Sequence, residues 1–502
     1  MADAELTEIQ KKATQYKDEG NDLFTKANYA RAAIAYSMAI DECERASETH
    51  PQMHVFYCNR AFCHIKMENY GSAISDAQQS VELKTDFAKA YYRRGVAHMA
   101  LARYAPAYKD FYKLCQLAPS DRVARERMQE AKKLMNSEKF LKAIEMESSK
   151  PASESVNIEE IEMPSGYDGP IYEGVAKLRE DSAYAAQYLK DVLEYQKGQQ
   201  NIPKRHVYQL VMDVIALLKT CSTVQHVDVP DEEHFNVCGD VHGQYYDLLN
   251  IFAINGNPSE SNPYLFNGDF VDRGSFSVEC IVALFVARLA YPNHVHLARG
   301  NHETKNMNKL YGFEGEVTAK YDQPLYELFC EAFCLLPLAH VLKEKVFVVH
   351  GGLFSKDGVA LEDLSKVDRV REPPDEGLMV EMLWSDPGPT PGRTASKRGV
   401  GVAFGPDVTA DFLKTNKLEM VVRSHEMKEE GYEVEHGGKL VTIFSAPNYC
   451  DQMGNKGALM KFSGKDMANP KYTAFEAVPH PQVRPMQYAN PMLMMGMMQG
   501  GR

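Results

Sequence analysis

Three segments near the N-terminus share one register of small and aromatic residues. They read "YKDEGNDLFTKANYARAAIAYSMAI", "YCNRAFCHIKMENYGSAISDAQQSV" and "YRRGVAHMALARYAPAYKDFYKL", and they align at Gly20, Ala61 and Gly95. The second interval is 34 residues, the tetratricopeptide (TPR) period, and a polar insertion around "CERASETHPQ" lengthens the first to 41. An ordinary helical bundle would not repeat this register. Residues 1–150 are therefore predicted to form an all-α TPR array of three repeats, capped by a charged helix over 120–147.

Two further segments lack hydrophobic periodicity. Residues 151–168 are rich in Pro, Ser, Gly and acidic residues, which is typical of a linker. Residues 481–502 form a Met-rich C-terminal tail with five methionines in the last eleven residues. The tail is expected to be either a frayed end or a short docking helix with an adaptable Met surface, and we assign it a regulatory role.

Charge and cysteine usage exclude several classes of protein. Residues 1–150 carry 23 Lys and Arg against 21 Asp and Glu, and the remainder carries 33 against 48, so the larger part is unsuited to nucleic-acid binding. Ten scattered cysteines without a C-x-x-C pair favour reduced thiols and a cytoplasmic and nuclear location. The polar start and the short apolar runs predict neither a signal peptide nor a membrane helix.

Residues 169–480 alternate between short apolar runs and helical stretches. The runs "PYLFN", "HVHLA", "KVFVVH", "LEMVVRSH" and "KLVTIFS" have the length and β-branched content of buried strands, and helices such as "SVECIVALFVARLA" separate them. This pattern predicts an α/β domain with a central layered sheet and flanking helices.

Metal-donor side chains follow five apolar stretches of this domain. In α/β sheets, ligands bind at the ends of the strands. Oxygen or nitrogen donors directly after five such stretches are therefore more than ordinary surface polarity. The donor set has no thiolate and is too large for one tetrahedral ion, which favours two divalent transition metals. Such a pair can share and deprotonate a water and hydrolyse a phosphate ester by in-line displacement. The donors are Asp240, His242, Asp269, Asn301, His350 and His425.

Seven motifs between Gly239 and Ala458 resemble those of the metal-dependent serine/threonine phosphoprotein phosphatases, the PPP family. They are "GDVHGQ", "GDFVDRGSFS", "RGNHE", "HGGLF", "WSDP", "RSHE" and "SAPNYCDQMGNKGA", in the family's order. The resemblance, together with the TPR array, implies a serine/threonine phosphatase with a metallophosphoesterase fold, a layered β-sandwich with flanking helices. Its metals are expected to be manganese, or iron and zinc, with magnesium a further candidate. One departure is Ala298, where the family usually has leucine.

The same resemblance implies a role for each site residue. Asp240, His242 and Asp269 would hold one metal, and Asp269 would bridge to a second held by Asn301, His350 and His425. His302 would protonate the leaving serine or threonine oxygen, with Asp272 orienting its ring. The residues expected to bind the phosphoryl group are Arg273, Arg398, Tyr449 and Asn301. Spacing alone would make Arg398 an ordinary loop arginine.

A set of polar residues in the predicted repeats matches the carboxylate clamp of TPR domains. On helical spacing they would line one groove suited to a peptide's C-terminal carboxylate and an adjacent acidic side chain. The resemblance implies that the ligand is the acidic C-terminal peptide of the ninety-kilodalton heat-shock chaperone. Each residue alone is more simply a solvated helix residue. The set is Lys17, Asn21, Asn59, Lys89 and Arg93, with Lys66 a possible sixth member.

The resemblance and the charge difference between the two parts also suggest autoinhibition. The hypothesis is that the array and the tail repress the catalytic domain until a chaperone peptide or a lipid competes. Two other readings stay open at this point: a TPR co-chaperone adaptor with a mainly scaffolding phosphatase domain, and a dinuclear phosphodiesterase. Intact metal donors argue against the first, and a diesterase would not require "SAPNYC" or two phosphate-binding arginines.

Overall fold

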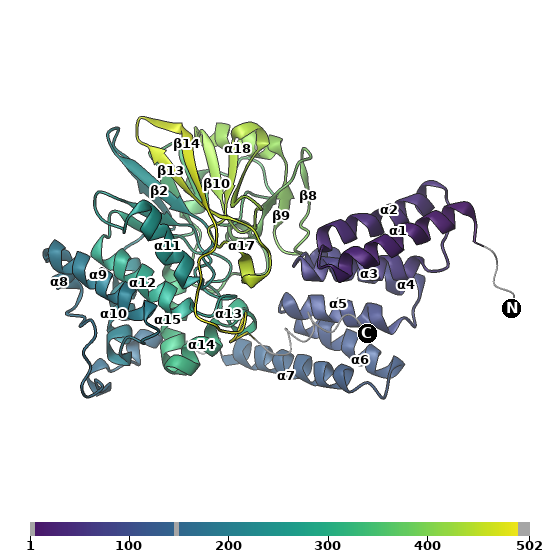
Figure 1. Cartoon of the computed structure of the whole chain (residues 1–502), viewed down its shortest axis with the longest axis horizontal. Coiled ribbons are helices and arrows are strands. Elements are labelled where there is room, and N and C mark those ends of the chain that lie inside the picture. Colours follow the sequence, from purple (N-terminus) through teal and green to yellow (C-terminus); the bar gives the residue numbers. More distant parts are fainter. Residues whose placement is uncertain (1–5, 145–149, 490–502) are drawn as a thin grey trace. The chain divides into compact units, whose positions relative to one another are not determined.

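A computed structural model describes residues 6–144 and 150–489 of the 502-residue chain (Figure 1). It divides into two compact units. The first contains the N-terminal helices, and the short segment Ser396–Val400 groups with it. The second contains the remaining described residues from Lys150 onward. In the described part of the chain, no helix is long and apolar enough to cross a membrane.

The first unit consists of helices, and each helix packs against the next one along the sequence. Glycines allow the two helices of a repeat to approach. A Cβ on Gly20 would lie 2.8 Å from the Tyr36 ring, and one on Gly95 would lie 2.7 Å from the Phe111 ring. The predicted helical repeat is thus present. The helices are α1 (Glu8–Thr25), α2 (Tyr29–Arg45), α3 (Met53–Lys66), α4 (Tyr70–Leu83), α5 (Ala88–Ala100), α6 (Tyr104–Leu117) and α7 (Arg122–Ile144).

A largely buried Arg–Asp pair recurs in the second and third repeats with the same 34-residue spacing. Arg60 donates from Nε and Nη2 to the two Asp76 oxygens at 2.8 and 2.7 Å. Arg94 does the same to Asp110 at 3.0 and 2.5 Å. These bidentate pairs tie the two helices of each repeat together. In the first repeat Ala35 takes the place of the aspartate.

Two sheets form the centre of the second unit. The six-stranded sheet has the order β1-β5-β6-β10-β12-β11, the five-stranded sheet has the order β14-β13-β2-β3-β4, and a small sheet has the order β7-β9-β8. Strands β2, β3 and β4 are parallel to one another, as are β6, β10 and β12. The strands are β1 (Val224–Val227), β2 (His234–Cys238), β3 (Tyr264–Phe266), β4 (Val295–Leu297), β5 (Ala339–Leu342), β6 (Val346–Val349), β7 (Asp386–Pro387), β8 (Arg393–Ala395), β9 (Val402–Phe404), β10 (Met420–Arg423), β11 (Tyr432–Glu435), β12 (Leu440–Ile443), β13 (Gly457–Ser463) and β14 (Asp466–Phe475).

Helices cover the outer faces of both sheets. One apolar core joins the five-stranded sheet to α9, α10, α12 and α15, which lie together in Figure 1, and another joins the six-stranded sheet to α17 and α18. The helices are α8 (Val175–Glu180), α9 (Ser182–Lys197), α10 (Lys204–Leu218), α11 (Tyr245–Asn255), α12 (Ser277–Ala290), α13 (Lys305–Tyr311), α14 (Phe313–Lys320), α15 (Gln323–Leu335), α16 (Leu361–Ser365), α17 (Leu378–Trp384) and α18 (Pro406–Asn416). Short 3-10 turns are η1 (Ala152–Glu154), η2 (Ile158–Glu160), η3 (His436–Gly438) and η4 (Tyr449–Asp451).

A third apolar core lies between the two sheets. Val237 and Leu265 of the five-stranded sheet share it with Val348, Val422 and Val441 of the six-stranded sheet. Because central strands such as β10 are buried on both faces, they read as continuous apolar runs in the sequence. The predicted fold class, a TPR array followed by a layered α/β sandwich with flanking helices, is confirmed.

Residues 175–197 form two helices, because Asp181 ends α8 and its side chain caps α9 by accepting from Tyr184 N. Two further details concern the predicted linker and the predicted tail. The predicted linker holds η1 and η2, and Ser153 bonds to Glu331 of α15 through both its N–H (2.8 Å) and its hydroxyl (2.7 Å). Of the Met-rich tail, residues 490–502 lie outside the described residues, while 481–489 belong to the second unit.

Candidate metal centre and active site

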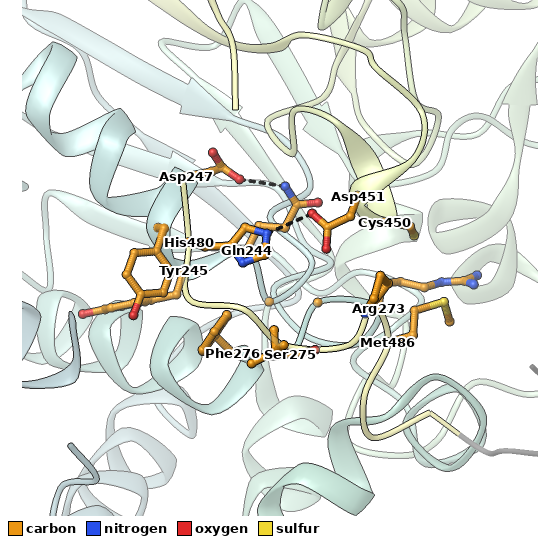
Figure 2. A pocket seen from close by; sticks show the side chains of 15 residues that line it. Gln244, Tyr245, Asp247, Arg273, Ser275, Phe276, Cys450, Asp451, His480 and Met486 are labelled. Carbon is orange, nitrogen blue, oxygen red and sulfur yellow. Dashed lines mark hydrogen bonds and ion pairs between the residues drawn. The ribbon is translucent and has the colours of Figure 1, made fainter. Parts of the chain in front are cut away.

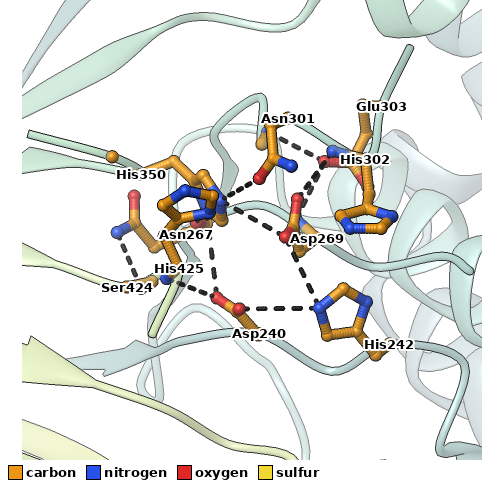
Figure 3. A network of polar contacts seen from close by, with 12 residues as sticks. Asp240, His242, Asn267, Asp269, Asn301, His302, Glu303, His350, Ser424 and His425 are labelled. Carbon is orange, nitrogen blue, oxygen red and sulfur yellow. Dashed lines mark hydrogen bonds and ion pairs between the residues drawn. The ribbon is translucent and has the colours of Figure 1, made fainter. Parts of the chain in front are cut away.

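The loops that leave five strands of the two sheets bring the predicted metal donors together (Figure 3). Asp240 and His242 follow β2, and Asp269 follows β3. The other donors are Asn301 after β4, His350 after β6 and His425 after β10. A bridge between Asp240 and Phe444 joins the exits of the two sheets. The close approach requires glycine at Gly239, where a Cβ would overlap the Ile443 carbonyl group.

Donor atoms of these residues converge within a few ångströms. His242 Nε2 lies 3.5 Å from Asp269 Oδ2 and 3.6 Å from Asp240 Oδ2. His350 Nε2 lies 3.3 Å from Asp269 Oδ2 and 2.9 Å from Asn301 Oδ1. Ligand atoms of Asp269, His350 and His425 all fall within 4.8 Å of one another. Asp269 is therefore shared by both halves of the cluster, as a bridging ligand would be.

Backbone carbonyl groups fix which ring nitrogen of two histidines faces the cluster. His242 Nδ1 bonds to Val271 O at 3.1 Å, and His350 Nδ1 bonds to Asn267 O at 2.8 Å. With Nδ1 protonated and donating, Nε2 of each ring carries the lone pair that would face a cation held between the carboxylates. This is the usual arrangement of a metal-binding imidazole.

The electrostatics of the cluster fit divalent cations. All six donors are buried. Burial opposes the charge of Asp269, but His350 and His302 outweigh it and hold the pKa of that carboxyl below its usual range. Burial likewise disfavours a charged His350, yet Asp269 raises the pKa of His350 to about 9. The buried site thus favours an ionised carboxylate and a positive charge beside it, which suits bound cations. Oxygen and imidazole donors suit transition metals.

Backbone strain is concentrated in the same loops. His242, Asp269, Asp272, Arg273 and His425 all have φ between 47° and 71°, the left-handed region that side-chain-bearing residues rarely adopt. Such conformations persist only where the surroundings impose them, and they cluster at functional sites.

His302 lies beside the cluster and is paired with Asp272. Its Nδ1 is 2.8 Å from Asp272 Oδ2, and its backbone N–H donates to Asp269 Oδ1 at 2.9 Å. A ligand atom of His302 also lies within 4.8 Å of His242 and Asp269 donor atoms. Because Asp272 engages Nδ1, only Nε2 of His302 is available to a substrate. This is the arrangement of an acid and the group that orients it.

The predicted phosphate-binding residues fall in different surroundings. Arg273 is buried with its guanidinium 3.6 Å from the centre of the Tyr311 ring. The Tyr449 ring is 5.1 Å from the His242 ring, beside the metal donors. Arg398 lies in the segment that groups with the first unit, where its N–H donates to Ser396 Oγ at 3.1 Å. Its role stays a prediction.

A pocket lies alongside Arg273 (Figure 2). Apart from that arginine, its wall is formed by residues adjacent to site residues, such as Gly243 and Cys450, and by the chain near the C-terminus. That chain is held by Val478 N donating to Asp247 Oδ1 at 2.9 Å and by His480 Nε2, 3.0 Å from Asp451 Oδ1.

Sequence reasoning missed a buried carboxylate that joins two of the site loops. Glu303 accepts the N–H groups of Asp269, Phe270 and Gly300, each at 2.8 Å, and it is fully buried. Burial and the charge of Asp269 raise the pKa of Glu303 to about 7. The residue stands next to His302 in "RGNHE", and nothing in the pattern distinguishes it from a surface glutamate.

The predicted clamp residues lie on the first helices of the three repeats. Asn21 Oδ1 accepts from Asn59 Nδ2 at 3.3 Å, and Asn59 Oδ1 accepts from Arg93 Nη1 at 3.2 Å. These bonds link α1, α3 and α5. Lys17 lies one turn before Asn21 and pairs with Asp18 at 2.7 Å, and Lys89 is exposed one turn before Arg93. Lys66 Nζ lies 5.3 Å from the centre of the Phe62 ring.

Comparisons with known proteins agree with this architecture. Residues 234–429 match the family described as "Calcineurin-like phosphoesterase", residues 88–121 match "Tetratricopeptide repeat", and residues 128–226 match "PPP5 TPR repeat region". The first of these implies divalent metal ions in the second unit.

Curated relatives match nearly the whole chain. Serine/threonine-protein phosphatase 5 of Rattus norvegicus is 47% identical over 489 residues, which cover 97% of this chain and 95% of the relative. Serine/threonine-protein phosphatase T of Trypanosoma brucei brucei is 44% identical and covers 95% of this chain and 98% of its own. A solved structure of a Saccharomyces cerevisiae protein serine/threonine phosphatase is 40% identical, with a TM-score of 0.56 over 58% of this chain and 95% of that one. With its TPR array and its metallophosphoesterase unit, the chain belongs to the serine/threonine-protein phosphatase 5 family and is a phosphoprotein phosphatase.

Proposed function

We propose that the cluster in Figure 3 hydrolyses phosphoserine and phosphothreonine in proteins. Asp240, His242 and Asp269 would hold one cation, and Asp269 with Asn301, His350 and His425 would hold a second. The two cations, when bound, supply positive charge for the phosphoryl oxygens and lower the pKa of water. The position of Asp269 between His242 and His350 is the observation that carries this proposal.

In this proposal His302 donates the proton to the leaving oxygen of serine or threonine. The bond from Nδ1 to Asp272 supports it, because it fixes the ring and leaves Nε2 to face the substrate. An alkoxide leaving group needs this proton, since it would otherwise depart as a strong base.

Arg273, Tyr449 and Arg398 are proposed to bind the phosphoryl oxygens. The planar guanidinium of Arg273 stacks on the face of the Tyr311 ring. This contact holds the N–H donors of Arg273 in one orientation before the substrate binds. Asn301 would add an amide to the same oxygens.

The test is metal-dependent release of phosphate from a phosphothreonine peptide. We expect turnover with manganese, a large loss in D269N and H302A, and little hydrolysis of a phosphodiester. No release from the metal-loaded protein would support the adaptor reading instead, and a preference for the diester would support a phosphodiesterase. Replacing manganese by iron with zinc, or by magnesium, then ranks the metals.

We further propose that the TPR array binds acidic peptides that end in a free carboxylate, such as the C-terminus of the ninety-kilodalton heat-shock chaperone. The hydrogen-bonded set Asn21, Asn59 and Arg93, with Lys17 and Lys89 beside it, supports this. A labelled acidic peptide should bind, its C-terminally amidated form should bind at least about tenfold more weakly, and K89A with R93A should abolish binding. Equal binding of both peptides would contradict a clamp.

Autoinhibition is the last part of the proposal. If the TPR array and the C-terminal tail restrain the catalytic unit until a chaperone peptide or a lipid competes, a protein lacking residues 1–165 should turn over substrate faster at equal metal occupancy. An unchanged rate would contradict it.

A further inference from the structure

We propose that Asn308 is a positioning residue of the phosphatase reaction, which fixes the His302–Asp272 pair so that His302 can deliver its proton. The inference rests on the proposed role of His302 as the acid. No motif of the sequence singled out Asn308, which lies on α13 and is fully buried.

Both members of the pair are held by the one amide group of Asn308. Its Nδ2 donates to Asp272 Oδ2 at 3.1 Å and to the backbone carbonyl oxygen of His302 at 2.7 Å. Since both partners are acceptors, the orientation of the amide is determined: a flipped group would place oxygen against oxygen. Asn308 thus sets the distance between the carboxylate and the backbone that carries the imidazole.

The contacts of Asp272 show what this bond controls. Asp272 Oδ1 accepts from Phe313 N at 2.9 Å, while Oδ2 is shared between His302 Nδ1 at 2.8 Å and Asn308 Nδ2. Without the amide, Oδ2 loses the donor that keeps the carboxylate facing His302. The backbone of His302 loses one of its hydrogen bonds at the same time, so the ring and its acceptor are held together less firmly.

The hydrogen bonds of the Asn308 amide to the described residues are all made by its donor end, toward Asp272 and His302. Asn308 Oδ1 is buried and accepts no hydrogen bond from the described residues.

The experiment compares substrates that do and do not need an acid. Wild type, N308A and N308D are loaded with manganese and assayed on a phosphothreonine peptide, whose alkoxide must be protonated, and on p-nitrophenyl phosphate, whose phenolate leaves without help. Both variants remove the donor, and N308D keeps the shape of the side chain. We expect kcat on the peptide to fall about 10- to 100-fold with KM nearly unchanged, while p-nitrophenyl phosphate turnover stays within about threefold.

N306A is the matched control, because Asn306 is an exposed asparagine on the same helix. It should leave both rates unchanged. Equal losses on both substrates in N308A and N308D, or no loss on the peptide, would overturn the inference.

H302A, assayed in parallel, separates failure of the positioning role from failure of the proposed function. If H302A spares p-nitrophenyl phosphate and the Asn308 variants do not, only the positioning role fails. If H302A affects both substrates equally, the acid role itself fails. Should N308A not fold, N308D decides.

Discussion

Tyr311 should contribute measurably to phosphate binding although it does not itself reach the phosphate. The guanidinium of Arg273 lies 3.6 Å from the centre of the Tyr311 ring, and both side chains are buried. A desolvated cation–π contact of this kind is worth about 1–2 kcal/mol, which corresponds to roughly 5- to 30-fold in affinity. We therefore expect Y311L to weaken binding of inorganic phosphate by that factor.

Product inhibition by inorganic phosphate measures this effect directly, since it reports equilibrium binding to the metal-loaded site. The matched control is Y311F, which keeps the aromatic face and removes only the hydroxyl group. It should bind phosphate within about twofold of wild type. Y311L binding as tightly as wild type, or Y311F weakened as much as Y311L, would refute the stacking argument. Because the Tyr311 ring is also 5.2 Å from the His302 ring, kcat is a less specific measure than phosphate affinity.

Three further predictions concern stability. Burial lowers the pKa of His296 to about 3 and lowers that of His340 well below its usual value, so both are neutral in the fold. The stability contributed by each of these neutral histidines should be fully present above pH 6.5 and decline below it by about 1.4 kcal/mol per pH unit. H296F with H340F should therefore reduce the pH dependence of the free energy of unfolding in urea between pH 7 and 5. An unchanged slope contradicts this. D110A leaves Arg94 without its carboxylate partner and should lower the free energy of unfolding of the TPR array by about 3–5 kcal/mol, measured by calorimetry. D110A combined with R94M should recover most of this loss. Similar melting temperatures for the single and double variants would contradict the prediction. In protein kept in metal at about 100 times the Kd of each site, chelation should remove about 2.7 kcal/mol of stability for each of the two cations and lower the Tm of the catalytic unit by several degrees. A Tm insensitive to chelator would argue that the site holds no cation.

The sequence was most informative where one local rule repeats. The 34-residue register requires small residues at Gly20 and Gly95, and the structure places an aromatic ring against each. The buried strands were visible as apolar runs, and the donors were visible because each follows such a run. Helix α12 begins and ends at the predicted residues, Ser277 and Ala290.

What could not be predicted depends on pairs of residues far apart in the chain. Glu303 and Asn308 matter because loops from different strands meet around them, and a lone Glu or Asn carries no periodic signal. Strand β14 was missed because it is largely exposed and polar, so its sequence lacks an apolar run. The bond between Ser153 and Glu331 is likewise a tertiary contact that a linker-like composition conceals.

The central claim is that two cations share Asp269 and together carry the phosphatase reaction. Its most direct measurement is equilibrium dialysis of the metal-depleted protein against manganese, with phosphate release from a phosphothreonine peptide followed in the same samples. Two manganese ions per chain are predicted at saturation, with activity appearing as the second ion binds, and D269N should lose both the second ion and at least about 100-fold in turnover. Full activity with one bound ion per chain, or a D269N variant that keeps two ions and its rate, would contradict the account.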